Sequence, residues 1–395
     1  MPSRQPVTPF PSWPPYGNIP KAHREGYWFN ELVGTFEASM KYLWLALLTS
    51  LVLGHSTQPG SSQPLELRPA STEFARAQMV DWIDSETFVV GRWDGSVSVF
   101  RTQRAGEWTP VLLQTQATAG GAGVELVVAL DERTILYSNG ENELALWGRT
   151  GKGAFDAPLP IGYDVTYGVA NSATQFHYLG DDLVVTGHAN GFALVWKRNY
   201  QSLTLLRAVD LKSANPIPSP YPLKNIRGLA AWKGDLVLSG SEDGDIVAFS
   251  VTTGKERFRQ RYSATAQRGI NAISEIDGQL LVVNCSVGAA DKNLWLYEVT
   301  DAGLTLTSSL NLIRDATRPQ VFDFDGDLFE AHGKVRFVAS TEEGLMWRGV
   351  VKAGVLEVDA FATVAPSGGA SLDVNDTTGG IVAVAYDVML FEGGN

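Results

Sequence analysis

A short pattern of apolar and polar residues recurs along most of this chain. Each copy has an apolar run, a small or hydroxyl residue, a turn rich in Gly, Asn and acidic residues, and a second apolar run. Two clear copies read FVVGRWDGSVSVF from Phe88 and LVLSGSEDGDIVAF from Leu236. Asp-Gly and Asn-Gly turns supply the positive φ angles that a tight hairpin needs. The pattern therefore predicts a succession of β-hairpins.

The hairpins recur at a nearly constant interval. Their turns are centred on Gly95, Asn142, Gly191, Gly244, Lys292, Gly344 and Asp387, with separations of 47, 49, 53, 48, 52 and 43 residues. A β-hairpin repeat of about 40–50 residues is typical of β-propellers, whose blades have four strands each. Most copies have a further apolar strand before and after the hairpin. We therefore predict an all-β, seven-bladed β-propeller over residues 64–395.

Large aromatic rings follow the turns at a regular position. In five copies the ring lies five residues after the turn, and we expect these rings to fill the space between neighbouring blades. They are Phe100, Trp147, Trp196, Phe249 and Tyr297. The last two copies depart from this spacing, with Trp347 and Phe391 closer to the turn.

The seventh copy ends after its third strand, close to Asn395. A blade without its fourth strand would leave an open sheet edge that invites aggregation. The segment Leu65–Leu67, just before the first copy, is the candidate for the missing strand. We therefore expect an N-terminal strand to close the propeller.

The repeat resembles WD-repeat and quinoprotein-like propellers over residues 64–395. Two details depart from WD repeats: no Gly-His dipeptide opens each blade, and the single Trp-Asp pair, Trp93-Asp94, lies in a turn. His188 follows Gly187, but it too lies beside a turn. The hydrogen-bonded tetrad of that family is therefore not carried over. The phrase Asp243–Arg259 is similar to a quinoprotein repeat, in one blade only.

The first sixty residues have a different pattern. Residues 1–25 are a Pro-rich extended arm, residues 26–54 form a predicted helix, and residues 55–63 are a linker. Apolar residues recur at helical spacing in the middle segment, among them Phe29, Phe36, Leu43 and Leu47. The phrase YWFNEL from Tyr27 resembles helical segments attached to sensor or effector modules in bacterial conflict systems.

Residues 40–54 leave several interpretations open. Their uncharged run of about 12 residues is shorter than the ~20 residues that span a bilayer. The run matches the apolar part of a signal peptide, although forty residues precede it. It is also consistent with a helix that docks on the propeller or on a partner. Docking implies a cytoplasmic protein, whereas the other interpretations imply export or a membrane anchor.

Composition argues against several functions. Lys and Arg number 31 against 43 Asp and Glu, which gives a net charge of −12 without any basic run, so nucleic acid is excluded as a partner. The single cysteine, Cys285, rules out an intrachain disulfide and a multi-cysteine zinc site. No phosphate-binding loop, dinucleotide motif or nucleophile elbow is present, and no cofactor is expected. Asp323, Asp325 and Asp327 resemble the start of a calcium loop but lack the distal glutamate.

The turns that carry the repeat gather acidic and aromatic residues. The residues predicted to contact a partner are Trp93, Asp94, Asn190, Tyr221, Asp243 and Glu343, with Glu141, Glu242, Asp245 and Glu342 beside them. Rigid turns with an aromatic ring among carboxylates suit a protein partner with a basic surface.

The sequence thus favours a non-catalytic interaction scaffold or sensor subunit in a bacterial regulatory or defence assembly, binding through the acidic face and the N-terminal helix. The alternative is an exported or anchored propeller that binds a ligand or acts as a hydrolase or quinoprotein.

Overall fold

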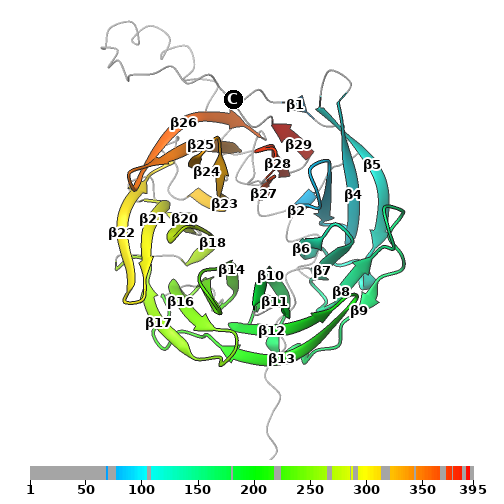
Figure 1. Cartoon of the computed structure of the whole chain (residues 1–395), viewed down its shortest axis with the longest axis horizontal. Helices are drawn as coiled ribbons and strands as arrows, with labels where there is room; N and C mark the ends of the chain where they lie inside the picture. Colours follow the sequence, from blue (N-terminus) through cyan, green and yellow to red (C-terminus); the bar gives the residue numbers. More distant parts are fainter. Residues whose placement is uncertain are drawn as a thin grey trace, which may run out of the picture. The chain divides into compact units, whose positions relative to one another are not determined.

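Seven antiparallel sheets are arranged around a common axis in the computed structural model, as blades of a propeller (Figure 1). The structure describes residues 68–69, 77–104, 108–178, 181–217, 224–264, 269–284, 286–287, 292–312, 321–341, 344–364, 371–375, 377–384 and 388–391. The predicted all-β, seven-bladed fold is confirmed. The predicted helix at residues 26–54 lies outside the described residues.

Each blade has four strands that we letter a to d from the central axis outward. Blade 1 consists of β2 (Ala77–Trp82), β3 (Thr87–Arg92), β4 (Ser96–Arg104) and β5 (Trp108–Ala117). Blade 2 consists of β6 (Val124–Asp131), β7 (Thr134–Asn139), β8 (Leu144–Gly148) and β9 (Leu159–Pro160). Blade 3 consists of β10 (Ala170–Tyr178), β11 (Asp181–His188), β12 (Phe192–Asn199) and β13 (Ser202–Asp210). Blade 4 consists of β14 (Ile226–Ala231), β15 (Leu236–Ser241), β16 (Asp245–Ser250) and β17 (Glu256–Arg261).

The remaining blades follow the same order with two variations. Blade 5 consists of β18 (Ile270–Ile276), β19 (Gln279–Asn284), β21 (Leu294–Thr300) and β22 (Gly303–Leu310). Blade 6 consists of β23 (Val321–Ala331), β24 (Lys334–Thr341), β25 (Leu345–Lys352) and β26 (Val355–Thr363), and β20 (Ser286–Val287) adds to its inner edge. Blade 7 consists of β27 (Ser371–Val374), β28 (Ile381–Val384), β29 (Val388–Phe391) and β1 (Arg68–Pro69).

The N-terminal part of the chain closes the ring, as predicted. Strand β1 pairs antiparallel with β29, with Arg68 opposite Leu390 and Pro69 opposite Met389. The paired residues follow directly after the predicted segment Leu65–Leu67, which itself lies outside the described residues. Blade 7 is therefore built from both ends of the propeller sequence.

Strand β20 is an addition that the repeat did not predict. The fifth copy of the repeat predicts one hairpin with its turn at Lys292. Instead, the connection between β19 and β21 contains β20, whose Ser286 lies opposite Phe322 of β23. A segment of blade 5 therefore pairs with blade 6 through backbone hydrogen bonds.

Seven apolar clusters hold neighbouring blades together, and the predicted aromatic rings lie within them. Phe100 of blade 1 packs with Val382 and Val384 of blade 7, and Trp147 of blade 2 packs with Val97 of blade 1. The five rings five residues after their turns are at most 2% exposed, and Phe391 is fully buried. Each buried aromatic side chain removes roughly 150–250 Å² from water, so each ring makes a large contribution to the packing between blades.

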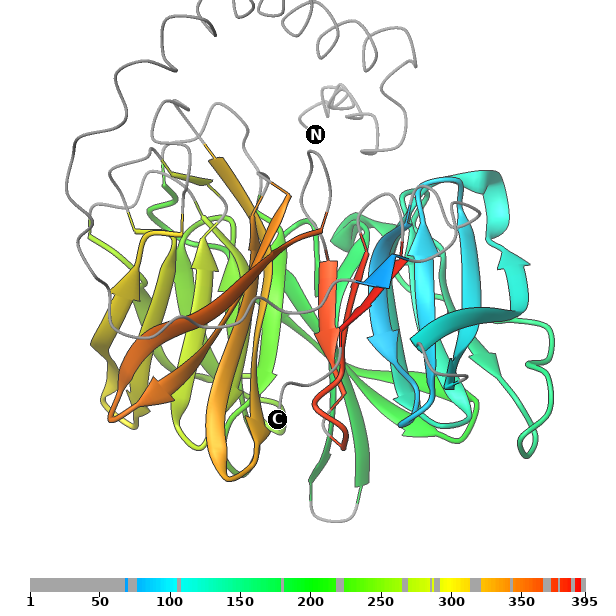
Figure 2. The same ribbon diagram turned by 90° about the horizontal axis from the view of Figure 1, so that it is seen from above.

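The turns between strands b and c lie on one face, which we call the upper face. The residue after strand d donates its N–H to the carbonyl oxygen of the turn glycine in four blades: Thr118 to Gly95 (2.7 Å), Leu211 to Gly191 (2.9 Å), Tyr262 to Gly244 (3.1 Å) and Val364 to Gly344 (2.7 Å). The connections from d to the next strand a therefore share this face. The a–b and c–d turns form the lower face, at the other end of the strands (Figure 2).

Candidate interaction surface

The upper face of blades 1 and 2 presents an exposed tryptophan beside two exposed carboxylates. Trp93 is 44% exposed in the b–c turn of blade 1, and the neighbouring Asp94 is also exposed. Asp94 accepts the N–H (3.0 Å) and hydroxyl (2.6 Å) of Ser96, which fixes the turn. Glu141 is exposed in the b–c turn of blade 2.

One connection brings these two turns together. A Cβ atom on Gly120 would overlap the carboxylate of Glu141, and a Cβ on Gly123 would lie 3.3 Å from the backbone oxygen of Trp93. The connection between β5 and β6 is therefore packed between the turns of blades 1 and 2. Its glycines leave room for Trp93 and Glu141 to lie on either side of one short loop.

Blade 3 extends this surface. Asn190 is exposed in its b–c turn, and the Asn190 amide donates to the backbone oxygen of Thr166. Thr166 belongs to the short 3₁₀ helix η5 (Val165–Tyr167), where Val165 is 62% exposed. The exposed Asp164 caps η5, and the Thr166 N–H donated to it lowers the pKa of the Asp164 carboxyl. None of the residues of η5 is among the predicted contact residues.

We define the upper-face patch as Trp93, Asp94, Glu141, Val165 and Asn190. It combines an aromatic ring, an aliphatic side chain and two carboxylates on turns that hydrogen bonds hold in place. Central aromatic side chains surrounded by polar groups are the usual anchors of protein–protein contacts.

The predicted acidic surface does not extend over blade 4. Glu242 accepts from Arg227 (2.7 Å), and Asp245 pairs with Arg259 (3.3 Å) and Arg261 (3.2 Å). Asp243 is 3% exposed and accepts the N–H of Ser213 at 3.1 Å. Burial is the largest cause that raises the pKa of the Asp243 carboxyl. These three carboxylates are therefore occupied inside the blade.

Several residues of the predicted surface lie outside the described residues, or have side chains outside them. They are Tyr221, Glu342, Glu343, Phe29, Phe36, Leu43 and Leu47. Their contribution to a partner contact stays a prediction.

A buried polar chain in blade 3 was missed by the sequence analysis. The indole N–H of Trp196 donates to Thr186 Oγ1 (2.8 Å), which lies 2.8 Å from His188 Nε2. His188 Nδ1 lies 3.0 Å from the backbone oxygen of Gly168. Burial lowers the pKa of His188 to about 4, so a neutral imidazole donates from Nδ1 and accepts at Nε2. In the sequence, the signal for this chain was the presence of Trp, Thr and His on two adjacent predicted strands of one blade.

The innermost strands carry a second set of buried polar groups. Asp81 of β2 accepts the N–H of Ala129 of β6 (2.5 Å), and Asp373 of β27 accepts the N–H of Trp82 (2.6 Å). Burial raises the pKa of Asp81 to about 6 and that of Asp373 well above its usual value. These carboxyls join strands of adjacent blades and have a structural role.

The candidate calcium ligands point to different neighbours. Asp325 accepts the hydroxyl of Ser371 (3.0 Å) and the N–H of Leu372 (3.1 Å) of blade 7, whereas Asp327 accepts the hydroxyl of Ser274 (2.5 Å) of blade 5. Burial raises the pKa of Asp325 to about 6. Within the described residues no group of three or more His, Cys, Asp or Glu side chains is placed to hold a metal ion. The Asp323 side chain lies outside that part of the structure.

The described residues contain no candidate for a membrane-spanning helix. No helix there is both long and apolar enough to cross a bilayer. Residues 40–54 lie outside this part.

The comparisons with known proteins identify the fold. No family model matches the sequence, and no curated protein matches it. Among solved structures, the chain is similar to the WD40 β-propeller domain of Doa1, with a TM-score of 0.57 and 16% sequence identity. The similarity covers 85% of this chain and 97% of that domain. With its seven four-stranded blades and N-terminal closing strand, the chain has the fold of a WD-repeat-like β-propeller.

Proposed function

We propose that this protein is a non-catalytic interaction subunit whose upper-face patch binds a protein partner. The exposed ring of Trp93, on the same face as the exposed carboxylates of Asp94 and Glu141, is the observation that carries the proposal. Large aromatic side chains dominate the binding energy of many interfaces, and a tight turn limits the entropy that Trp93 loses on binding.

Charge favours a partner with basic side chains. Asp94 and Glu141 are exposed on the b–c turns of blades 1 and 2, and Asp164 is exposed on the connection between blades 2 and 3. Lys212 and the exposed Asp210 form an ion pair at 3.0 Å, so that lysine does not neutralise the charge of these three carboxylates. Complementary charge at the rim of an interface raises the association rate more than the affinity.

Crosslinking in host cells tests the patch. A photoreactive phenylalanine analogue replaces Trp93, or replaces Tyr200, a 53% exposed aromatic residue on the lower face. We expect a discrete crosslinked partner from position 93 that is absent from position 200. Adding the D94K and E141K substitutions should reduce the yield from position 93, because both remove a negative charge that attracts the partner. Equal yields from both positions, or no effect of the charge reversals, would refute the proposal.

The N-terminal segment 26–54 is the second contact in this proposal, and it implies a cytoplasmic protein. The intact mass of the protein isolated from its native host tests this part separately. A mass that includes residues 26–54 supports a docking segment. A mature chain that starts near His55 would instead indicate export with cleavage.

A further inference from the structure

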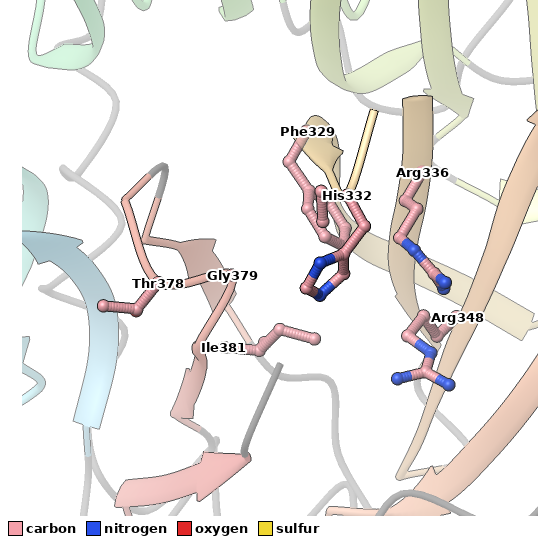
Figure 3. A pocket seen from close by; sticks show the side chains of 8 residues that line it. Phe329, His332, Arg336, Arg348, Thr378, Gly379 and Ile381 are labelled. Carbon is pink, nitrogen blue, oxygen red and sulfur yellow. The ribbon is translucent and has the colours of Figure 1, made fainter. Parts of the chain in front are cut away.

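A small pocket lies on the lower face, between blades 6 and 7. Figure 3 shows the imidazole of His332 and the guanidinium groups of Arg336 and Arg348 on one side, with Thr378 and Gly379 on the other. The first three come from β24, β25 and the turn before them, whereas the last two come from the a–b turn of blade 7. The pocket lies at the opposite end of the strands from the upper-face patch.

The arginines carry more charge than their partner neutralises. Arg336 Nη1 lies 2.9 Å from one carboxylate oxygen of Asp359, and Arg348 Nε lies 2.9 Å from the other. Two guanidinium groups therefore share one carboxylate, which leaves one positive charge. Arg336 Nε is buried and makes no hydrogen bond within the described residues. Since a guanidinium has five N–H donors, each arginine keeps donors for a further acceptor.

The pocket walls are held by short backbone turns. His332 and Gly333 have φ angles of 54° and 67°, and Ala331 pairs with Lys334, which makes a type I′ turn that fixes the position of the imidazole. Opposite it, Gly379 donates its N–H to the backbone oxygen of Asn375 at 2.7 Å. The Asn375 side-chain amide in turn donates to the backbone oxygen of Asp84 of blade 1 (3.0 Å). The site therefore needs little rearrangement to bind a ligand.

Size restricts what can enter. The pocket volume is about 20 Å³, far below the ~300–1,000 Å³ of pockets that enclose whole small molecules. One tetrahedral or planar oxyanion fits this space better than a nucleotide. Arginine forks suit such groups, because two N–H donors can bind two oxygens of a carboxylate or a phosphate.

We propose that the pocket formed by His332, Arg336, Arg348 and Thr378 binds a single oxyanion, a phosphate or carboxylate group. Arg336 and Arg348 supply the positive charge and the N–H donors, and the turn that contains Thr378 and Gly379 forms the opposite wall. Asp359 holds the two guanidinium groups in place and competes with the ligand for them.

Calorimetric titration of the whole protein with inorganic phosphate tests this site. We expect R348Q and R336Q to weaken phosphate binding at least tenfold. The D359N variant should strengthen it several-fold, because it removes the competing carboxylate. This gain distinguishes a binding site from a purely structural ion pair, which D359N would only weaken. The matched control is R257Q, since Arg257 is an exposed arginine that only approaches Asp301, at 3.9 Å.

Peptides then separate the sources of the oxyanion. Three hexapeptides with a central phosphoserine, glutamate or serine are titrated against the wild type and R348Q. Tighter binding of either acidic peptide than of the serine peptide, lost in R348Q, identifies the group that the site prefers. If R348Q does not fold, R348K and H332N provide the comparison, because Lys keeps the charge and Asn tolerates a positive φ. Phosphate affinities unchanged in all arginine variants, or lowered in D359N, would overturn the assignment.

Discussion

Asp373 accepts the backbone N–H of Trp82 at 2.6 Å, although the two residues lie 291 positions apart in the chain. They belong to the innermost strands of blades 7 and 1, which are in different sheets. Ser274 likewise accepts the N–H of Leu328 at 3.0 Å, from blade 5 to blade 6. Around the axis, polar side chains thus satisfy backbone donors that no neighbouring strand can pair with.

Two buried carboxyl groups on the innermost strands, those of Asp81 and Asp373, make the stability of the fold depend on pH. Burial raises the pKa of Asp81 and Asp373, so the folded protein binds more protons than the unfolded chain between pH 4 and 6. Their contribution to the free energy of unfolding is therefore lost as pH rises through this range. In D373N the amide cannot ionise, yet its oxygen still accepts the N–H of Trp82. We expect D373N to be more stable than the wild type at pH 7.5, and to lose this advantage at pH 4.

Denaturant unfolding at pH 4, 6 and 7.5 measures this difference. The control is D156N, because Asp156 is exposed and its backbone oxygen, rather than its carboxylate, accepts the indole N–H of Trp147. If D373N changes the free energy of unfolding by the same amount at all three pH values, the Asp373 carboxyl does not have a raised pKa in the folded protein.

The polar chain of blade 3 depends on the Thr186 hydroxyl. In T186V the side chain keeps its shape, but Trp196 loses its acceptor and His188 loses its donor. Each unsatisfied buried group costs about 1–3 kcal/mol, so we expect T186V to lower the free energy of unfolding by about 2–4 kcal/mol. Denaturant unfolding checks this value against T204V, whose threonine is exposed on β13. Equal effects of the two substitutions would show that the chain contributes nothing.

The burial of His188 predicts a second pH dependence of stability, opposite in sign to that of Asp81 and Asp373. Its pKa of about 4 in the folded protein lies below the value of about 6.5 in an unfolded chain, so the unfolded chain takes up a proton first as pH falls. Its contribution to stability is full above pH 6.5 and is lost towards pH 4, by about 3 kcal/mol in all. Side-chain NMR of the folded protein should show the His188 ring neutral at pH 5.5. A titration midpoint near 6.5 would disprove its burial as a neutral donor.

Removing the closing strand should destabilise the ring. A chain that begins at Ala70 lacks β1 and leaves the edge of β29 unpaired, whereas a chain that begins at Ser62 keeps it. We expect the shorter chain to unfold several degrees lower and to aggregate more, since an unpaired edge strand can pair with another molecule. Thermal unfolding and light scattering of the two truncations provide the comparison. Identical melting temperatures would mean that β1 contributes no stability.

The sequence predicted those parts of the fold that depend on local geometry. Gly95, Asn142, Gly191, Gly244 and Gly344 all have the positive φ angles that the hairpins require. The aromatic rings were also predictable, because their spacing from the turn sets the face on which they lie. Both features repeat along the chain, which makes them visible without knowledge of long-range contacts.

The candidate sites were harder to predict, because they depend on contacts between strands and blades that the pattern of a single repeat does not show. Asp245 lies opposite Arg261 only through the register of β16 and β17, so its carboxylate seemed available to a partner. The oxyanion pocket combines strands of blade 6 with a turn of blade 7. Neither the sharing of Asp359 by two arginines nor the approach of the blade 7 turn leaves a signal in sequence spacing.

The packing of blade 1 against blade 7 has a consequence for the folding of the chain during its synthesis. Ala77, Phe88 and Phe100 of the first blade pack against Val384 and Leu390, which the ribosome adds some 300 residues later. Until those residues emerge, one side of the earliest blade has no permanent cover, and the nascent chain exposes an apolar surface that other chains can bind. Chaperone occupancy of ribosome-bound intermediates should therefore persist until translation is nearly complete.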